Sequence, residues 1–441
     1  MEPDRPSSSG RGARLGQYWI VRRIGHGSFG TVYEAVIRGS AGAGRRVAIK
    51  KLRAHVVNSE PEFIQSMANE ARIGALLNHA NVVRVLQFGR RRNHYYLAMD
   101  FVDGADLGQL VRACGFHGVG LPRFAVIDFA RQIIRGLQHA HGLRDDEGNP
   151  TELVHRDIKP SNVLVDRQGI ARVGDFGVAR STTNVYVTTL SGVIKGTPRY
   201  MSPEQVVGEK PLDRRSDLFS AGAVLYEMIT GDYLFDGRTL PSLAHAIMRS
   251  DLVPRLAEAE AAMPGCRPVL ERLLRRDPDA RYPEASEVDR DLMELAKGYP
   301  AESSLADVVG RLLPLVDRSG SVEIDDTAAL ERDLHGVDAD EGATVSLENP
   351  RADGSTVRHV ARTASWDRFN SAFQSPESVS GGSPPAPAGT PGPVAGGGGR
   401  RAFARVGIAI AVVLAIVVFA VVGTRLGPCT GAAEQNQEEG G

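Results

Sequence analysis

The sequence predicts an α+β fold in which strands come early and helical segments follow. The segment after a glycine-rich turn at 25–30 alternates and is rich in β-branched residues, so the turn is predicted to join two strands. Another strand pattern lies at 47–51, and apolar residues at helical spacing occupy 61–78. The chain has 441 residues, enough for two to four domains of roughly 100–200 residues.

The composition is that of an ordinary soluble protein over most of the chain. Apolar residues make up 42% and charged residues 24%, so a large core can be buried. The formal net charge of −1 argues against a nucleic-acid binder, and no nucleic acid is expected among the partners. Cys114, Cys266 and Cys429 are too far apart in the sequence to predict a disulfide framework or a zinc site.

Changes in composition divide the chain into six segments. The start is polar and lacks the apolar stretch of a signal peptide. The long segment before the last apolar stretch is first acidic and then rich in Gly, Ser and Pro, so it buries too little apolar surface to become ordered. We expect a disordered arm at 1–17, a folded domain at 18–297, a helical appendage at 298–320, a disordered linker at 321–405, a transmembrane helix at 406–424 and a short external tail at 425–441.

Residues 406–424 have the length and composition of a membrane span. They carry no charge, and as a helix they would extend about 28 Å, close to the roughly 30 Å of a bilayer's hydrocarbon core. Arg400, Arg401 and Arg405 precede the span and only Arg425 follows it, so the positive-inside rule places the N-terminal bulk in the cytoplasm. We expect a single-pass protein of the inner cell membrane, with the lipid bilayer as a partner.

Small residues recur every four positions in this span, at Gly407, Ala411 and Ala415. Such a face lets two helices approach closely, which is compatible with a homodimer. The same spacing also arises by chance in an alanine-rich helix, so both interpretations stay open.

The motif GHGSFG at 25–30 fits a loop that covers phosphates. A dinucleotide-binding loop of the same pattern needs a helix directly after the last glycine and an acidic residue about 20 positions later. Here an alternating segment follows at 31–36, and Lys50 occupies the position 20 residues after Gly30. The sequence therefore favours a hairpin whose backbone N–H groups approach phosphate oxygens.

One basic and one acidic side chain are placed to support such a phosphate site. If Ala48 faces the nucleotide, strand alternation puts Lys50 on the same face and Lys51 on the other. The helical segment at 61–78 offers Glu70, which could pair with Lys50 and hold it toward phosphate. A lone strand lysine is usually solvated, so this pairing depends on the remaining motifs.

The strongest signal is the motif HRDIKPSN at 155–162, followed by GDFG at 174–177. Phosphoryl transfer requires a carboxylate near the attacking hydroxyl, a cation on the γ-phosphate and oxygen ligands for Mg²⁺. Asp157, Lys159 and Asn162 are followed by the carboxylate of Asp175. Each group alone is common on protein surfaces, but the four at these spacings are not expected by chance.

With these motifs the chain resembles the eukaryotic-like (Hanks-type) serine/threonine protein kinases over about residues 18–297. The resemblance implies a bilobal fold, with a small antiparallel-sheet lobe that carries one helix and a larger helical lobe. It implies ATP and Mg²⁺, or Mn²⁺ in its place, and protein substrates with Ser or Thr hydroxyls, this chain included. A polar insertion at 143–150 is similar to a feature of some bacterial kinases.

The resemblance assigns roles to matching positions of this chain. Asp157 would be the catalytic base, and Lys159 would steady the γ-phosphate. Asn162 and Asp175 would hold Mg²⁺. The residues implied at the nucleotide are Ile24, Gly25, Gly27, Gly30, Val32, Ala48, Lys50 on the α- and β-phosphates with its partner Glu70, the gatekeeper Met99, the hinge residues Phe101 and Val102, Asp106 near the ribose, and Asp175.

The resemblance also implies control by phosphate on the activation segment. Arg156 beside the catalytic aspartate would bind such a phosphate, and Thr188 and Thr189 are the expected autophosphorylation sites. Thr197 would place a structural hydroxyl beside Asp157. The implied structural contacts are a buried ion pair between Glu204 and Arg281 and an anchor for the catalytic loop at Asp217.

Two other functions use the same kind of domain. A membrane-bound pseudokinase scaffold is less favoured, because all six core positions carry competent residue types. A small-molecule kinase is disfavoured by GTPRY at 196–200 and SPE at 202–204, which are typical of a peptide-binding segment. Lys159 and the GTPRY motif favour serine/threonine over tyrosine specificity.

Gly74 departs from the family pattern. It occupies a position where these kinases place a bulky residue that packs against Val85, His155 and Phe176. A glycine there is expected to leave a hole and to cost its helix about 0.5–1 kcal/mol. We expect the helix to be held loosely until phosphorylation or dimerisation fixes it.

Overall fold

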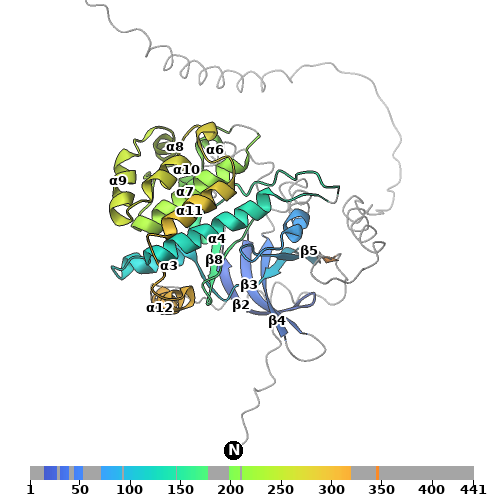
Figure 1. The fold of residues 1–441 in the computed structure, drawn as a ribbon. Helices are drawn as coiled ribbons and strands as arrows, with labels where there is room; N and C mark the ends of the chain where they lie inside the picture. Colours follow the sequence, from blue (N-terminus) through green and yellow to red (C-terminus); the bar gives the residue numbers. More distant parts are fainter. Residues whose placement is uncertain are drawn as a thin grey trace, which may run out of the picture. The chain divides into compact units, whose positions relative to one another are not determined.

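The computed structural model describes residues 14–26, 30–38, 44–52, 71–91, 94–145, 147–176, 198–208, 211–318 and 344–346. They form a small lobe built on a sheet and a larger helical lobe (Figure 1). This arrangement agrees with the bilobal α+β prediction. The span predicted at 406–424 lies outside the described residues, and no helix within them is both long and apolar enough to cross a membrane.

An antiparallel sheet forms the small lobe, with its strands in the order β1-β2-β3-β4-β6-β5-β10. The predicted glycine-rich turn joins β2 to β3, as expected. One cluster of the sheet's side chains, including Tyr18, Ala35 and Ile49, is buried. The strands are β1 (Arg14–Leu15), β2 (Tyr18–His26), β3 (Gly30–Arg38), β4 (Gly44–Leu52), β5 (Val85–Arg91), β6 (His94–Asp100) and β10 (Thr344–Ser346).

Helix α7 (Arg214–Thr230) lies at the centre of the larger lobe, and every residue from Ser216 to Met228 is buried. It packs against α4, α9 and α10, while α11 lies along α4 (Figure 1). A helix buried on all sides forms the core rather than covering it. The other helices are α3 (Leu107–Phe116), α4 (Arg123–His141), α6 (Pro203–Val207), α8 (Leu240–Arg249), α9 (Val253–Ala262), α10 (Arg267–Leu273), α11 (Ala285–Ala296) and α12 (Leu305–Arg318).

A second sheet and a short backbone ladder lie where the lobes meet. Strands β7 (Gly104–Asp106), β8 (Val163–Asp166) and β9 (Ala171–Val173) pair in that order. The amide of Val83 donates to the carbonyl of Val173 at 2.9 Å, and the amide of Val173 donates to the carbonyl of Asn81 at 2.9 Å. These bonds attach the segment before β5 to the strand that leads into Asp175.

The structure corrects two of the predicted segments and agrees with a third. The arm expected to be disordered to residue 17 contains β1, in which Leu15 is buried against the sheet. The linker expected to be disordered contains β10, which pairs with β5. The predicted helical appendage is confirmed, because α12 packs against α3 and buries Val309 in the core of the larger lobe. Composition did not reveal the two strands β1 and β10. Pairing with a strand edge uses backbone groups, which every sequence has, so it leaves no signal in the side chains.

Candidate active site

One aspartate of α7 is hydrogen-bonded to the backbone of the predicted catalytic loop. Asp217 accepts hydrogen bonds from the backbone amides of His155 (2.8 Å) and Arg156 (2.7 Å), and its Oδ2 lies 2.8 Å from His141 Nε2. Arg156 has a φ of +66°, a conformation that non-glycine residues seldom adopt. The two bonds to Asp217 stabilise this turn, and the expected anchoring role of Asp217 is confirmed.

Two predicted catalytic side chains donate hydrogen bonds to a third. Lys159 Nζ donates to Asp157 Oδ2 at 2.8 Å, and Asn162 Nδ2 donates to the carbonyl of Asp157 at 2.8 Å and to its Oδ2 at 3.2 Å. The lysine and the amide thus fix the carboxylate of Asp157. The carboxylate is 19% exposed, so it can be reached from solvent.

A second carboxylate is attached to this group through the backbone. The amide of Gly174 donates to the carbonyl of Asn162 at 2.8 Å, and His155 Nε2 lies 2.9 Å from the carbonyl of Gly174. The amide of Asp157 donates to His155 Nδ1 at 3.2 Å, so Nδ1 is the acceptor and Nε2 carries the proton. His155 therefore links the two motifs and places Asp175 directly after them.

Lys50 forms an ion pair with Asp175, with Nζ 2.8 Å from Oδ2. Burial alone would raise the pKa of Asp175, but the ion pair and hydrogen bond with Lys50 outweigh it and hold that pKa below its usual range. Asp175 also has a φ of +57°. Glu70, the predicted partner of Lys50, lies outside the described residues, so that pairing stays a prediction.

The sheet aligns several predicted nucleotide residues in rows across its strands. Gly25 on β2 lies opposite Val32 on β3, which lies opposite Lys50 on β4. Ala48 lies opposite Met99 on β6. Gly30 begins β3, whereas Ile24 is exposed near the end of β2.

The segment between the lobes carries the remaining predicted nucleotide residues. Phe101 and Val102 are half-buried after β6. Asp106 caps α3 by accepting a hydrogen bond from the amide of Gln109 at 2.8 Å, and burial raises its pKa. The cap explains the aspartate structurally, so a contact with ribose stays a prediction. The predicted residues that lie outside the described part of the chain are Gly27, Glu70, Thr188, Thr189 and Thr197.

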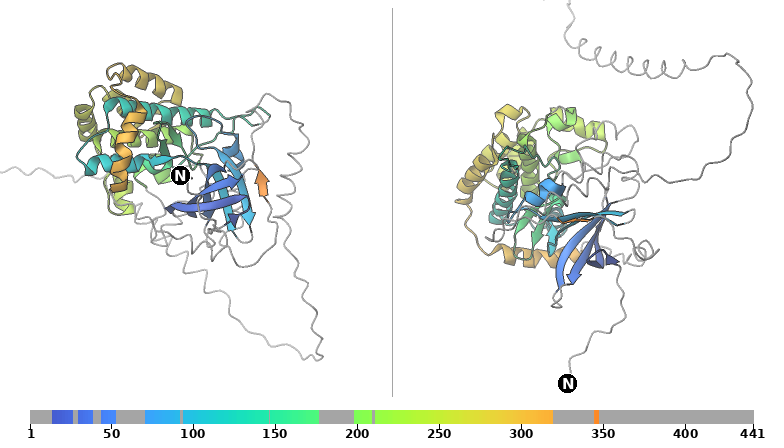
Figure 2. Two further views of the ribbon diagram at one scale, coloured as in Figure 1. Left: turned by 90° about the horizontal axis from the view of Figure 1, so that it is seen from below. Right: turned by 90° about the vertical axis from the view of Figure 1, so that its right-hand side faces the viewer.

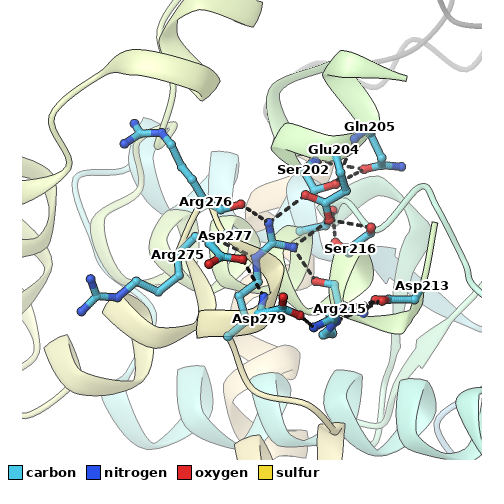
Figure 3. A network of polar contacts seen from close by, with 12 residues as sticks. Ser202, Glu204, Gln205, Asp213, Arg215, Ser216, Arg275, Arg276, Asp277 and Asp279 are labelled. Carbon is cyan, nitrogen blue, oxygen red and sulfur yellow. Dashed lines mark hydrogen bonds and ion pairs between the residues drawn. The ribbon is translucent and has the colours of Figure 1, made fainter. Parts of the chain in front are cut away.

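A buried ion pair ties α6 to the region before α11, as the resemblance implied. Both Nη atoms of Arg281 lie 2.7 Å from the carboxylate oxygens of Glu204. Ser216 donates to the same carboxylate at 2.6 Å (Figure 3). Burial would raise the pKa of Glu204, but the bonds from Arg281 and Ser216 lower it below its usual range.

Two residues that the motif analysis missed support the catalytic loop. Gln205 donates through Nε2 to the carbonyl of Arg156 at 2.8 Å, and His141 contacts Asp217. Gln205 also completes a capping box with Ser202. The sequence SPEQ at 202–205 has the serine and glutamine spacing of such a box, so this residue could have been found. His141 is apparent only once α4 and α7 are packed together.

The space beside Gly74 is smaller than a missing side chain. Gly74, Val85, Met99 and Phe176 contribute to the lining of a cavity of about 10 Å³, which is close to the space of one water molecule. A Cβ atom added at Gly74 would lie 3.1 Å from Val85 Cγ2. The expected hole therefore exists, but Val85 has taken much of its volume. Looseness of the helix stays a prediction.

The residues present fit a phosphate-bound divalent cation. Asn162 offers an amide oxygen and Asp175 a carboxylate, which are ligands that Mg²⁺ accepts. Among the described residues no group of three or more His, Cys, Asp or Glu side chains could hold a metal alone. A cation that takes its other ligands from substrate phosphates and water matches such a sparse donor set.

Comparison with known proteins decides the family. A model of the protein kinase domain matches residues 18–291. The chain belongs to the protein kinase family. The tyrosine-protein kinase MasK of Myxococcus xanthus is 33% identical over 270 residues, which cover 61% of this chain and 41% of MasK. The serine/threonine-protein kinase PknB of Mycobacterium leprae is 31% identical over 326 residues, 73% of this chain and 48% of PknB.

Other relatives are similar over the same region. The serine/threonine-protein kinase PrkC of Bacillus subtilis is 32% identical over 281 residues, 63% of this chain and 40% of PrkC. Among solved structures, the kinase domain of Mycobacterium tuberculosis PknI is 24% identical, covers 65% of this chain and 100% of that domain, and has a TM-score of 0.48. The chain spans less than half the length of these three curated kinases.

Proposed function

We propose that this protein is a serine/threonine protein kinase that transfers the γ-phosphate of ATP to protein hydroxyls. The observation that best supports the proposal is a set of linked acidic, basic and amide side chains where the two lobes meet. In it, Asp157 is bonded to Lys159 and Asn162, and Asp175 is paired with Lys50. Phosphoryl transfer is mostly positioning and charge neutralisation, and these side chains supply both.

Each side chain has a defined task in this proposal. Asp157 accepts the proton of the substrate hydroxyl. Lys159, already bonded to Asp157, neutralises charge on the transferred phosphoryl group. Lys50 binds the other phosphates, and Asn162 with Asp175 would hold Mg²⁺. Bound Mg²⁺, or Mn²⁺ in its place, would neutralise charge between the phosphates. Arg156 lies beside this group and would bind an activation-segment phosphate, for which Thr188 and Thr189 are the proposed autophosphorylation sites.

Hydroxyl specificity is the part of the proposal that the relatives leave open. PknB and PrkC are named serine/threonine kinases, whereas MasK is named a tyrosine kinase. Lys159 and the GTPRY motif at 196–200 favour serine and threonine in this chain. The proposed location is the inner membrane, with the kinase domain in the cytoplasm. The uncharged stretch at 406–424 and the arginines before it support this location. A homodimer through that span is part of the same proposal.

The test is transfer of labelled phosphate from Mg-ATP in the full chain, followed by phosphosite mapping. Asp157→Asn is expected to lower the rate by about 100-fold or more, because a positioned base contributes that much. Asp232→Asn, an exposed aspartate in the loop after α7, is the matched control and should leave the rate unchanged.

Phosphate on Thr188 or Thr189 in the wild type, and on neither residue in Asp157→Asn, would support the proposed autophosphorylation of the activation segment. Label on tyrosine only would overturn the proposed specificity. Full activity in Asp157→Asn would overturn the catalytic assignment. Thermal melting of both variants checks that the fold is retained.

A further inference from the structure

The outer edge of the small-lobe sheet is occupied by a segment that lies far along the chain. Strand β10 pairs antiparallel with β5, with Thr344 opposite Gly89, Val345 opposite Phe88 and Ser346 opposite Gln87. Figure 2 shows β10 as a short orange arrow beside the sheet. The other side of β5 is paired with β6, so β5 would be an edge strand without it.

An edge strand offers a row of backbone donors and acceptors that readily pair with another extended segment. Such strand addition obtains its affinity from main-chain hydrogen bonds rather than from particular side chains. The segment that adds here comes from a stretch whose composition gave no strand prediction. We therefore attribute the pairing to the open backbone groups at the edge of β5 rather than to a strand preference of residues 344–346.

We propose that the β5 edge is a docking site for the chain's own segment 344–346, which attaches the acidic linker to the small lobe. The contact is with the strand whose first residue, Val85, lines the cavity beside Gly74. Occupation of the edge therefore restrains the part of the small lobe that adjoins the active site. The proposal is independent of catalytic activity and goes beyond the proposed phosphotransfer.

Backbone hydrogen exchange in the full chain, measured without ATP, tests the docking. The test variant is Thr344→Pro/Val345→Pro. In an antiparallel pair, the backbone N–H groups of successive residues point alternately toward the partner strand and away from it. One of the two prolines must therefore remove an N–H group that donates to β5. The same dipeptide recurs at Thr356 and Val357, and Thr356→Pro/Val357→Pro is the matched control. Exchange in peptides from β5 should become about threefold faster or more in the test variant only.

Three outcomes overturn the proposal. The first is unchanged β5 exchange in the test variant, and the second is equal acceleration in the control. The third is protection of β5 that falls on dilution of the wild type, because this would assign the strand to a second copy. Exchange in α4 and α7 reports the fold of each variant. Faster exchange in α4 and α7 of the test variant would show general unfolding. The test is then repeated with the chain truncated after residue 337, in which exchange in β5 must be faster than in the wild type.

Discussion

Arg281 joins several segments of the larger lobe through its guanidinium group. Its guanidinium pairs with both oxygens of Glu204 and donates to the carbonyls of Arg215, Arg275 and Arg276. The Arg281 side chain has no exposed surface, and that of Glu204 is 9% exposed. A charge buried this completely is tolerated only because all its donors are used.

Replacing Arg281 with alanine should lower the free energy of unfolding by about 3–5 kcal/mol, because it leaves the Glu204 carboxylate buried and unpaired. Arg275→Ala removes an exposed ion pair with Glu271 and should cost no more than about 0.5 kcal/mol. Urea denaturation of both variants measures the difference. Equal losses would show that burial of Arg281 does not set the cost.

The same pair makes a prediction about pH. The pKa of Glu204 is lowered in the folded state, so the folded protein holds its proton less tightly than the unfolded chain does. The stabilisation is therefore complete above the ordinary glutamate value of about 4.3 and is lost as the pH falls through the lower folded pKa. The gap in unfolding free energy between wild type and Glu204→Gln should be constant from pH 8 to 5 and shrink below pH 4. A gap that widens on acidification would contradict the assigned direction.

At the scale of elements, α4 approaches the segment before β5 closely, at the place where the two lobes meet. A Cβ atom added at Gly136 of α4 would lie 2.5 Å from the carbonyl oxygen of Asn81. That carbonyl also accepts the ladder hydrogen bond from Val173. Only glycine lets the helix approach this closely without displacing the ladder.

Gly136→Ala should therefore destabilise the protein by about 1–3 kcal/mol, as overpacking does. Gly310→Ala in α12 is the matched control, because no atom lies within 4 Å of the added Cβ. There the better helix propensity of alanine should stabilise by about 0.5–1 kcal/mol. Opposite signs in thermal denaturation are the expected result, and the same sign at both sites would refute the close-approach argument.

At the scale of the whole molecule, the prediction that remains is membrane attachment. Deleting residues 406–424 should move the full chain from the vesicle pellet to the supernatant, because burying that stretch is what would hold it in the bilayer. Deleting residues 381–399, which are equally many and lie in the Gly- and Pro-rich linker, should leave the chain in the pellet. Sedimentation after an alkaline wash measures both, and a wild type found in the supernatant would end the proposal.

Much of the active site could be predicted because its parts are local in sequence. Asp157, Lys159 and Asn162 lie within six residues, and together with Asp175 their spacing indicates phosphoryl transfer. The residues that hold them in place are distant along the chain. Gln205 and His141 were missed, because a support of this kind is recognisable only from the contact it makes.

The sequence by itself determined the protein kinase family, the division into a small sheet lobe and a larger helical lobe, and the residue types of the candidate catalytic group. Each of these depends on short-range patterns of residue type and spacing. Only the tertiary structure decided that Lys50 pairs with Asp175, that Val85 narrows the space beside Gly74, and that 14–15 and 344–346 are strands. Those features arise where segments distant in the sequence come into contact. They depend on backbone hydrogen bonding and on the space between packed side chains, and neither produces a periodic pattern of residue types.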